Sequence, residues 1–89
     1  MKPVHIAETA IDDLLAITQY ILSYSTKAAG DFVDAFDKVL DDLRRFPEIG
    51  TLEPDAETRV LRRDKYLFIY IVESDHLELT RILDGRRRR

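Results

Sequence analysis

The sequence predicts an α+β domain in which an antiparallel helical hairpin packs on one face of a sheet, in the element order β-α-α-β-β-β. Two consecutive stretches, about 9–24 and 26–46, repeat apolar residues at helical spacing. Residues 66–73, Tyr-Leu-Phe-Ile-Tyr-Ile-Val-Glu, are rich in aromatic and β-branched residues, which favours a strand. Turns of two residues flank this run, so the last three strands are expected to form an antiparallel meander.

The N-terminal segment predicts a short strand followed by a helix. Residues 2–7 alternate along a strand, and Pro3 restricts that strand to a sheet edge or to pairing beyond the proline. Thr9 is predicted as the helix N-cap, with Asp12 in the capping-box position. The helix should run to about residue 24, and its predicted buried row is Ile11, Leu14, Leu15, Ile21 and Leu22.

The second helix has clear end signals. Ser25 and Thr26 are candidate N-caps. Pro47 ends the helix, because the residue before a proline disfavours helical dihedrals. A turn over residues 47–50 follows, in which Gly50 is free to adopt positive φ. The predicted buried row of this helix is Phe32, Val33, Phe36, Val39, Leu40 and Leu43.

A predicted loop over residues 51–58 leads into three strands at 59–63, 66–73 and 76–83. The middle strand is apolar on both faces, which predicts a central position in the sheet. One of its faces carries the aromatic side chains, and the helical hairpin should cover one face. The pattern alone leaves open whether the aromatic face is core or a surface that a partner covers; it favours both over a base-stacking platform.

Composition narrows the class of protein. The 89 residues predict a single domain over 1–89. The sequence has no cysteine, and its two histidines are 71 residues apart, so no metal site and no cofactor are indicated. No glycine-rich phosphate loop is present. The sequence also lacks a run of about 18 apolar residues, and its early acidic residue argues against a signal peptide, so we expect a soluble cytoplasmic protein.

The charge is distributed unevenly. Residues 1–58 carry 12 acidic and 5 basic side chains, whereas residues 59–89 carry 9 basic and 5 acidic side chains and end in four arginines. Such a split predicts that the C-terminal part contacts something anionic. The alternative is that the two parts complement each other within the fold, and that the arginine tail is a solvated end.

Several stretches spread over nearly the whole chain resemble the RelE/ParE superfamily of toxins from bacterial toxin–antitoxin modules. They are Ala10-Ile11-Asp12-Asp13-Leu14-Leu15-Ala16-Ile17, Tyr20-Ile21, Ala28-Ala29 before Phe32, Leu43-Arg44-Arg45-Phe46-Pro47-Glu48-Ile49-Gly50, Arg59, Tyr66-Leu67-Phe68-Ile69-Tyr70 and Arg81-Ile82-Leu83-Asp84-Gly85-Arg86-Arg87. The resemblance implies the fold predicted above. It also implies one of two activities: ribosome-dependent cleavage of messenger RNA, as in RelE-like members, or inhibition of DNA gyrase, as in ParE-like members.

The residues favour the ParE-like activity. Cleavage of RNA needs a proton acceptor, a proton donor and cations around the phosphate. The candidates for a nuclease are Arg59, Lys65, His76 and Arg81. Where many family members read His-Gly-Arg-Arg, this chain has Asp84, and an ordinary aspartate is ionised at pH 7 and a poor proton donor. We therefore expect a protein inhibitor and keep the endoribonuclease as the alternative.

The resemblance also implies partners. They are a ParD-like antitoxin, which would lay a helix on the helical hairpin and add to the sheet, and DNA gyrase; a heterotetramer with the antitoxin is expected. A further alternative is a non-toxic interaction module. For Arg81 a partner contact and an internal ion pair with Asp84 or Glu73 remain equally open. The predicted partner-binding residues are Arg59, Arg62, Tyr66, Tyr70, Arg81, Arg86, Arg87, Arg88 and Arg89.

Overall fold

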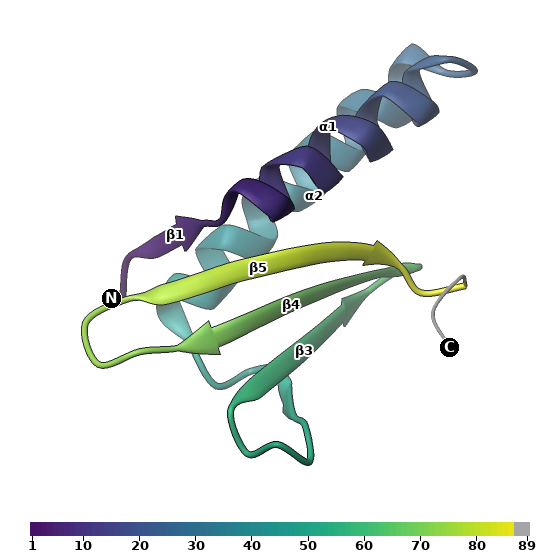
Figure 1. Cartoon of the computed structure of the whole chain (residues 1–89). Helices are drawn as coiled ribbons and strands as arrows, with labels where there is room; N and C mark the ends of the chain where they lie inside the picture. The colour runs from purple at the N-terminus through teal and green to yellow at the C-terminus, as the bar shows by residue number, and fades with distance from the viewer. Residues whose placement is uncertain (87–89) are drawn as a thin grey trace.

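The computed structural model describes residues 1–86, in which a helical hairpin lies across one face of a single sheet (Figure 1). The predicted partner contacts at Arg87, Arg88 and Arg89 lie outside the described residues. No helix within 1–86 is long and apolar enough to cross a membrane. The elements are β1 (Val4–Ile6), α1 (Glu8–Leu22), α2 (Thr26–Arg45), β2 (Thr51–Leu52), β3 (Thr58–Arg63), β4 (Tyr66–Val72) and β5 (Leu77–Asp84).

The strands lie in the order β1-β5-β4-β3-β2, so the aromatic strand β4 is central, as predicted. Strands β3, β4 and β5 form the predicted antiparallel meander. The register of β5 shifts at Thr80, because Ile69 faces Arg81 and Tyr70 faces Leu79. Thr80 is the extra residue of this bulge, and its hydroxyl donates to the Ile69 carbonyl at 3.0 Å, which compensates for the interrupted ladder.

Strand β1 pairs with β5 in parallel and forms one edge of the sheet. The amide of Leu77 donates to the Pro3 carbonyl, and the amide of Ala7 donates to the Leu79 carbonyl, each at 2.9 Å. The edge position expected from Pro3 is confirmed. The partner strand and its parallel direction were not predicted, since nothing local in either strand identifies the other.

The predicted loop over 51–58 contains a strand, which is a correction. Strand β2 pairs with β3 through Thr51 opposite Val60 and Leu52 opposite Arg59. The rest of the segment is a turn organised by Asp55, whose carboxylate accepts from the backbone amide and the hydroxyl of Thr58 at 2.8 and 2.7 Å. A two-residue strand is too short to leave a recognisable alternation in the sequence.

The core lies between α2 and the aromatic face of β4, which answers the question that the sequence left open. Phe32 and Phe36 of α2 pack on Tyr66 and Phe68, with ring centroids 4.8 and 6.3 Å apart. Tyr70 is completely buried. The aromatic rings are therefore internal, and the opposite face of the sheet carries the remaining apolar side chains of β4.

Helix α1 is rotated relative to the prediction. Its core-facing row is Ala10, Leu14, Ile17 and Ile21, whereas Ile11, Leu15 and Leu22 of the predicted row are 42%, 54% and 51% exposed. The two rows lie about 100° apart on the helix, so apolar spacing alone does not distinguish them. The predicted capping box is also wrong, because α1 begins at Glu8 and has no side-chain cap. The predicted cap of α2 is confirmed: Ser25 Oγ accepts from the Ala28 amide at 3.0 Å.

At Gly50, the segment that follows α2 passes close to Tyr70 of β4. The φ of Gly50 is not positive, contrary to the prediction, since no glycine in the described range has positive φ. Its amide donates to the Tyr70 hydroxyl at 2.8 Å. A Cβ at this position would lie 2.7 Å from that hydroxyl oxygen and 2.8 Å from Cε1 of the same ring. Glycine is needed here for space rather than for backbone freedom.

We predict that Gly50→Ala destabilises the fold by about 1–3 kcal/mol, because the added methyl group forces the buried Tyr70 ring to move. Urea unfolding measures the change. Gly30→Ala is the matched control: Gly30 lies inside α2 with nothing within 4 Å of its Cβ position, so that exchange should stabilise the protein by roughly 0.5–1 kcal/mol. Equal effects at the two glycines would contradict the assignment.

Candidate functional site

Arg59 is held by the chain that follows α2. Its Nη1 donates to the Gly50 carbonyl at 2.8 Å and to the Glu48 carbonyl at 3.2 Å. The neighbouring Tyr70 hydroxyl accepts from the Gly50 amide, and burial raises the pKa of that hydroxyl, so it stays protonated. Arg59 therefore stabilises the α2–β2 connection, and its guanidinium is committed to backbone carbonyls.

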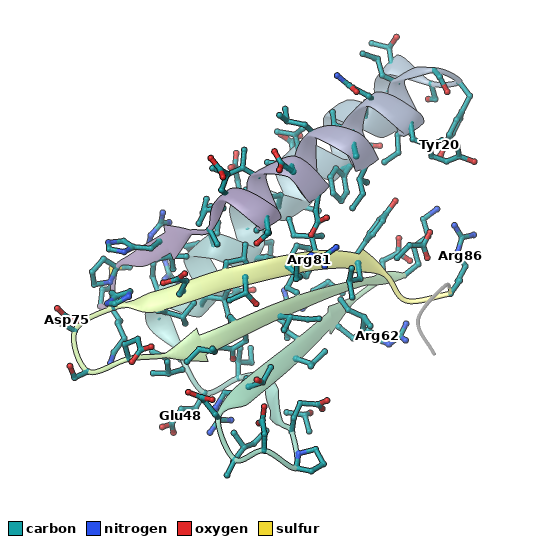
Figure 2. The ribbon with its side chains drawn as sticks, in the orientation of Figure 1. Tyr20, Glu48, Arg62, Asp75, Arg81 and Arg86 are labelled. Carbon is teal, nitrogen blue, oxygen red and sulfur yellow. The ribbon has the colours of Figure 1, made fainter. Side chains whose placement is uncertain are left out.

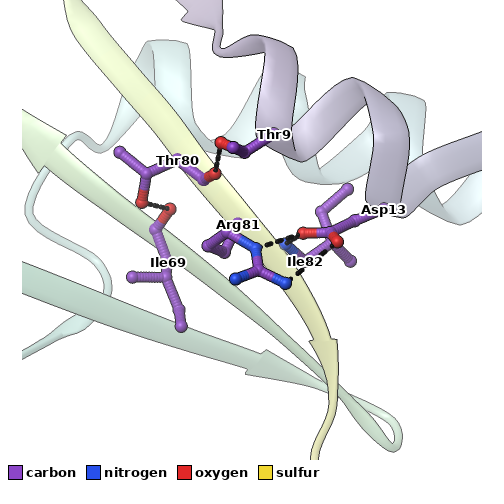
Figure 3. Close-up of polar contacts among 6 residues, drawn as sticks. All are labelled: Thr9, Asp13, Ile69, Thr80, Arg81 and Ile82. Atoms are coloured by element: carbon purple, nitrogen blue, oxygen red, sulfur yellow. Dashed lines mark hydrogen bonds and ion pairs between the residues drawn. The ribbon is translucent and has the colours of Figure 1, made fainter.

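Arg81 is paired with Asp13 of α1, an acid that the sequence did not identify as its partner (Figure 3). Its Nε and Nη2 donate to the two carboxylate oxygens at 2.7 and 3.1 Å. The same carboxylate accepts from the backbone amide of Ile82 at 2.9 Å. One helix turn earlier, the Thr9 hydroxyl donates to the Thr80 carbonyl at 2.7 Å. Of the two readings of Arg81, the geometry supports the internal ion pair.

Burial acts to raise the pKa of Asp13, but the hydrogen bonds from Arg81 and Ile82 and the positive charge of Arg81 outweigh it, and the pKa is lowered. The Asp13 side chain is 18% exposed and that of Arg81 is 47% exposed, so this ion pair is only partly screened by water. The carboxylate is ionised at neutral pH and cancels the charge of the arginine.

His76 lies at the opposite end of β4 from Lys65. Its Nδ1 is 2.8 Å from the Asp75 carboxylate, and this hydrogen bond raises the pKa of His76. The His5 ring packs on it at 4.4 Å between centroids. Lys65 precedes the first residue of β4 and His76 faces its last residues, which separates them by roughly 20 Å of strand. Figure 2 shows Asp75 and Arg86 at opposite ends of the sheet.

Asp84 occupies the position at which the resemblance implies a histidine. Its carboxylate accepts from the backbone amide of Arg86 at 3.0 Å and from Arg86 Nη2 at 2.8 Å. These hydrogen bonds stabilise the turn after β5. The four nuclease candidates do not converge on one point: Arg59 contacts the α2–β2 connection, Arg81 is paired with Asp13, and Lys65 and His76 lie at opposite ends of β4.

Three cations do gather, at the corner where the β3–β4 turn meets the end of β5. We define this cationic corner as Arg62, Lys65 and Arg86. Gly85 makes the approach possible: its amide donates to the Lys65 carbonyl at 2.6 Å, and a Cβ on it would lie 3.0 Å from Arg62 Nη2. Within residues 1–86, neither Arg62 nor Lys65 forms an ion pair with a carboxylate.

Tyr66 and Tyr70, the two tyrosines predicted to contact a partner, lie in the core rather than at the surface. Tyr70 has no exposed surface and Tyr66 is 9% exposed, so both belong to the core in this structure. A cavity of about 380 Å³ opens beside Tyr66, between α2 and the β3–β4 turn, with Tyr24, Phe32 and Arg63 in its lining. We leave Tyr70 out of any proposed contact surface, because a partner cannot reach it without unfolding the core.

Sequence reasoning missed an exposed apolar row on the hairpin. The sequence predicts Ile11, Leu15 and Leu22 of α1 and Val33 of α2 as core, but each is exposed, Val33 by 39%. One feature of the sequence indicates this exposure: α1 carries two apolar rows, although a single row is enough to cover its buried face. No group of three or more metal-ligating side chains occurs in the described part of the chain.

Over residues 4–89 the sequence matches the family described as ParE toxin of type II toxin-antitoxin system, parDE. Among solved structures, a chain of the chromosomal ParDE TA system from P. aeruginosa superimposes with a TM-score of 0.76 at 20% sequence identity, covering 92% of this chain and 94% of that one. At this identity the likeness concerns the fold. No curated protein matches the sequence.

We predict that Asp13→Ala costs about 1–3 kcal/mol of stability, because it leaves the Ile82 amide without its acceptor, and that Asp13→Asn costs less. Because the pKa of folded Asp13 is lowered, its contribution is present above the pKa of the unfolded chain and is lost as the pH falls through the lower folded value. Urea unfolding from about pH 3 to 7 measures the stability cost of each substitution and the dependence of that cost on pH.

The matched control is Asp34→Asn, an exposed α2 residue without an ion pair in the described range, which should change stability by less than ~0.5 kcal/mol. If the difference between the wild type and Asp13→Asn stayed constant down to the lowest pH, the assigned role of the carboxylate would be wrong.

Proposed function

The chain belongs to the ParE toxin family of type II toxin–antitoxin systems, and we propose that it is a protein inhibitor of DNA gyrase that a ParD-like antitoxin neutralises. We further propose that two toxin and two antitoxin chains assemble as a heterotetramer in the cytoplasm. The observation that carries the inhibitor role is the dispersal of Arg59, Lys65, His76 and Arg81, each held in a separate contact.

The contacts of these residues argue against phosphodiester chemistry. Stabilising a pentavalent phosphate requires cations aimed at one point and free of carboxylates. Arg81 is neutralised by Asp13, and Arg59 donates to two carbonyls of the chain itself. The carboxylate of Asp84 would repel a phosphate. The RelE-like endoribonuclease remains the alternative that the decisive assay must address.

The cationic corner supports the proposal that the target of this protein is anionic. Arg62 is exposed, Lys65 lies over the Tyr66 ring at 5.7 Å, and neither has a carboxylate partner among residues 1–86. A gyrase complex offers such a surface through its bound DNA and acidic side chains. We propose that this corner contacts the gyrase–DNA complex, and that charge steers the encounter.

The first assay separates the two activities. Antitoxin-free protein is added to gyrase and relaxed plasmid, and the same preparation is added to a translating-ribosome reaction. We expect loss of supercoiling, accumulation of cleaved DNA on gyrase, and intact messenger RNA. Cut messenger RNA with unaffected supercoiling would reverse the proposal in favour of the endoribonuclease. Activity in neither assay would favour an interaction module.

The second assay addresses the corner. We predict that Arg62→Gln combined with Lys65→Gln raises the concentration needed for half-inhibition of gyrase by roughly tenfold, because two unpaired charges are lost from the contact. Lys38→Gln, an exposed cation on α2 without an ion pair in the described range, is the matched control and should leave inhibition unchanged. Thermal unfolding verifies the fold of each variant, and equal inhibition by all three proteins would exclude the corner.

A further inference from the structure

The face of the sheet that the hairpin leaves uncovered carries a second group of apolar side chains. The aromatic side chains of β4 pack on α2, so the residues between them point to the other side of the sheet, because successive residues of a strand alternate. Paired residues on neighbouring strands share a face, and the register adds one apolar residue each from β3 and β5. We define the open-face cluster as Val60, Leu67, Ile69, Ile71 and Leu83.

The open-face cluster is separate from the core between the hairpin and the sheet. In the described part of the chain, none of its five side chains belongs to that core or packs against it. Leu67 is buried, and the other four side chains are half-buried. Both helices lie on the other side of the sheet (Figure 1). An apolar group that the core does not include and no helix covers is a candidate interaction surface.

The register also places the charged residues of this face. Arg62 lies on β3 beside the β3–β4 turn, and Glu78 lies on β5 at the other end of the face, so the two occupy diagonally opposite corners. Arg81 is the third charged residue among those of β3, β4 and β5 that point to this side, and Asp13 neutralises it. The face thus has one positive and one negative corner, with the open-face cluster between them.

The charges at the two corners are poorly satisfied within residues 1–86. Arg62 is exposed and pairs with no carboxylate there, and its Nη1 lies 3.5 Å from the carbonyl oxygen of Asp64. The carboxylate of Glu78 has its ion-pair partner, His76 Nε2, at 3.8 Å. A half-exposed ion pair at that distance contributes little. Both corners can therefore accept a closer partner of opposite charge.

The arrangement of these charges suits a second copy of this chain. A nucleic acid needs a surface of net positive charge, whereas the two corner charges cancel. A two-fold axis through the cluster, along the other diagonal of the face, places Arg62 of each copy against Glu78 of the other copy and brings the two Ile69 side chains together. The strands of the two sheets then cross at nearly a right angle, which is one of the ways in which sheets pack. The face is self-complementary.

The size of the face predicts a weak association. Three strands at about 4.8 Å spacing and six residues at about 3.3 Å give a surface of roughly 15 by 20 Å. A standard interface buries about 800 Å² on each partner, which is more than this surface offers in projection. We therefore expect a dissociation constant of about 10–100 µM rather than a permanent dimer.

We propose that the chain forms a face-to-face dimer through the open-face cluster, with Arg62 of each copy paired to Glu78 of the other. This dimer goes beyond the proposed function and does not depend on it. One consequence does rest on the proposed function: the dimer covers Arg62, a member of the cationic corner, so self-association and contact with the gyrase–DNA complex exclude each other.

Sedimentation velocity of the complete, antitoxin-free chain tests the association. Between about 5 and 500 µM, we expect a change from monomer to dimer. Methyl chemical shifts of the labelled protein should change over the same range at the open-face cluster. Sodium chloride at about 0.5 M should weaken the association, because it screens the two ion pairs.

Exchange of the two corner charges is the decisive test. Arg62→Glu and Glu78→Arg each place like charges at both ion pairs, so each variant alone should associate roughly tenfold more weakly. An equimolar mixture of the two variants restores both ion pairs and should associate about as tightly as the wild type. Lys38→Glu, a charge reversal at an exposed position of α2, is the matched control and should leave the association unchanged. Thermal unfolding verifies that each variant folds.

A chain that stays monomeric over the whole concentration range would overturn the proposal. The same conclusion follows from a dimer that both single variants form as readily as the wild type, from a mixture that associates no better than its components, or from methyl shifts confined to the hairpin. These outcomes are separate from the gyrase assay. A protein that inhibits gyrase but stays monomeric retains the proposed function and loses this inference, and a dimer that leaves gyrase active does the reverse.

Discussion

The outer edge of β5 is the constraint on which the arrangement of the other elements depends. Strand β1 pairs with β5 only as far as Leu79. Beyond that point, side chains of α1 replace the missing strand: Thr9 donates to the Thr80 carbonyl, and Asp13 accepts from the Ile82 amide. Leaving a backbone amide of this kind unpaired costs about 1–3 kcal/mol. A helix thus completes a sheet edge, which also protects the edge from pairing with other chains.

This closure sets the rotation of α1 and, through it, the distribution of apolar side chains. With Thr9 and Asp13 turned toward β5, the row of Ala10, Leu14, Ile17 and Ile21 faces the core. The neighbouring row is then turned outward beside α2. The apolar surface of the hairpin is exposed because α1 is rotated so that Thr9 and Asp13 bind the edge of β5. A partner can reach this surface, since the core is complete without it.

The same contacts determine where the basic side chains of the sheet lie. Arg81 is needed to hold Asp13, and Arg59 is needed to hold the chain that crosses Tyr70. Arg62 and Lys65, which have no carboxylate partner in the described range, lie at the corner of the sheet where Gly85 approaches the Arg62 guanidinium and the Lys65 carbonyl.

The sequence by itself determined the types and order of the elements, the meander and the central position of β4, because periodicity, proline and turn length act within a few residues. The tertiary structure decided the parallel pairing of β1, the buried row of α1, the aromatic face as core and the role of Gly50. Each depends on contacts between distant residues: Asp13 and Arg81 are 68 positions apart, and Gly50 and Tyr70 are 20 apart. Local patterns identify which residues need a partner, but only packing selects the partner, since several acids and several apolar rows satisfy the same local rule.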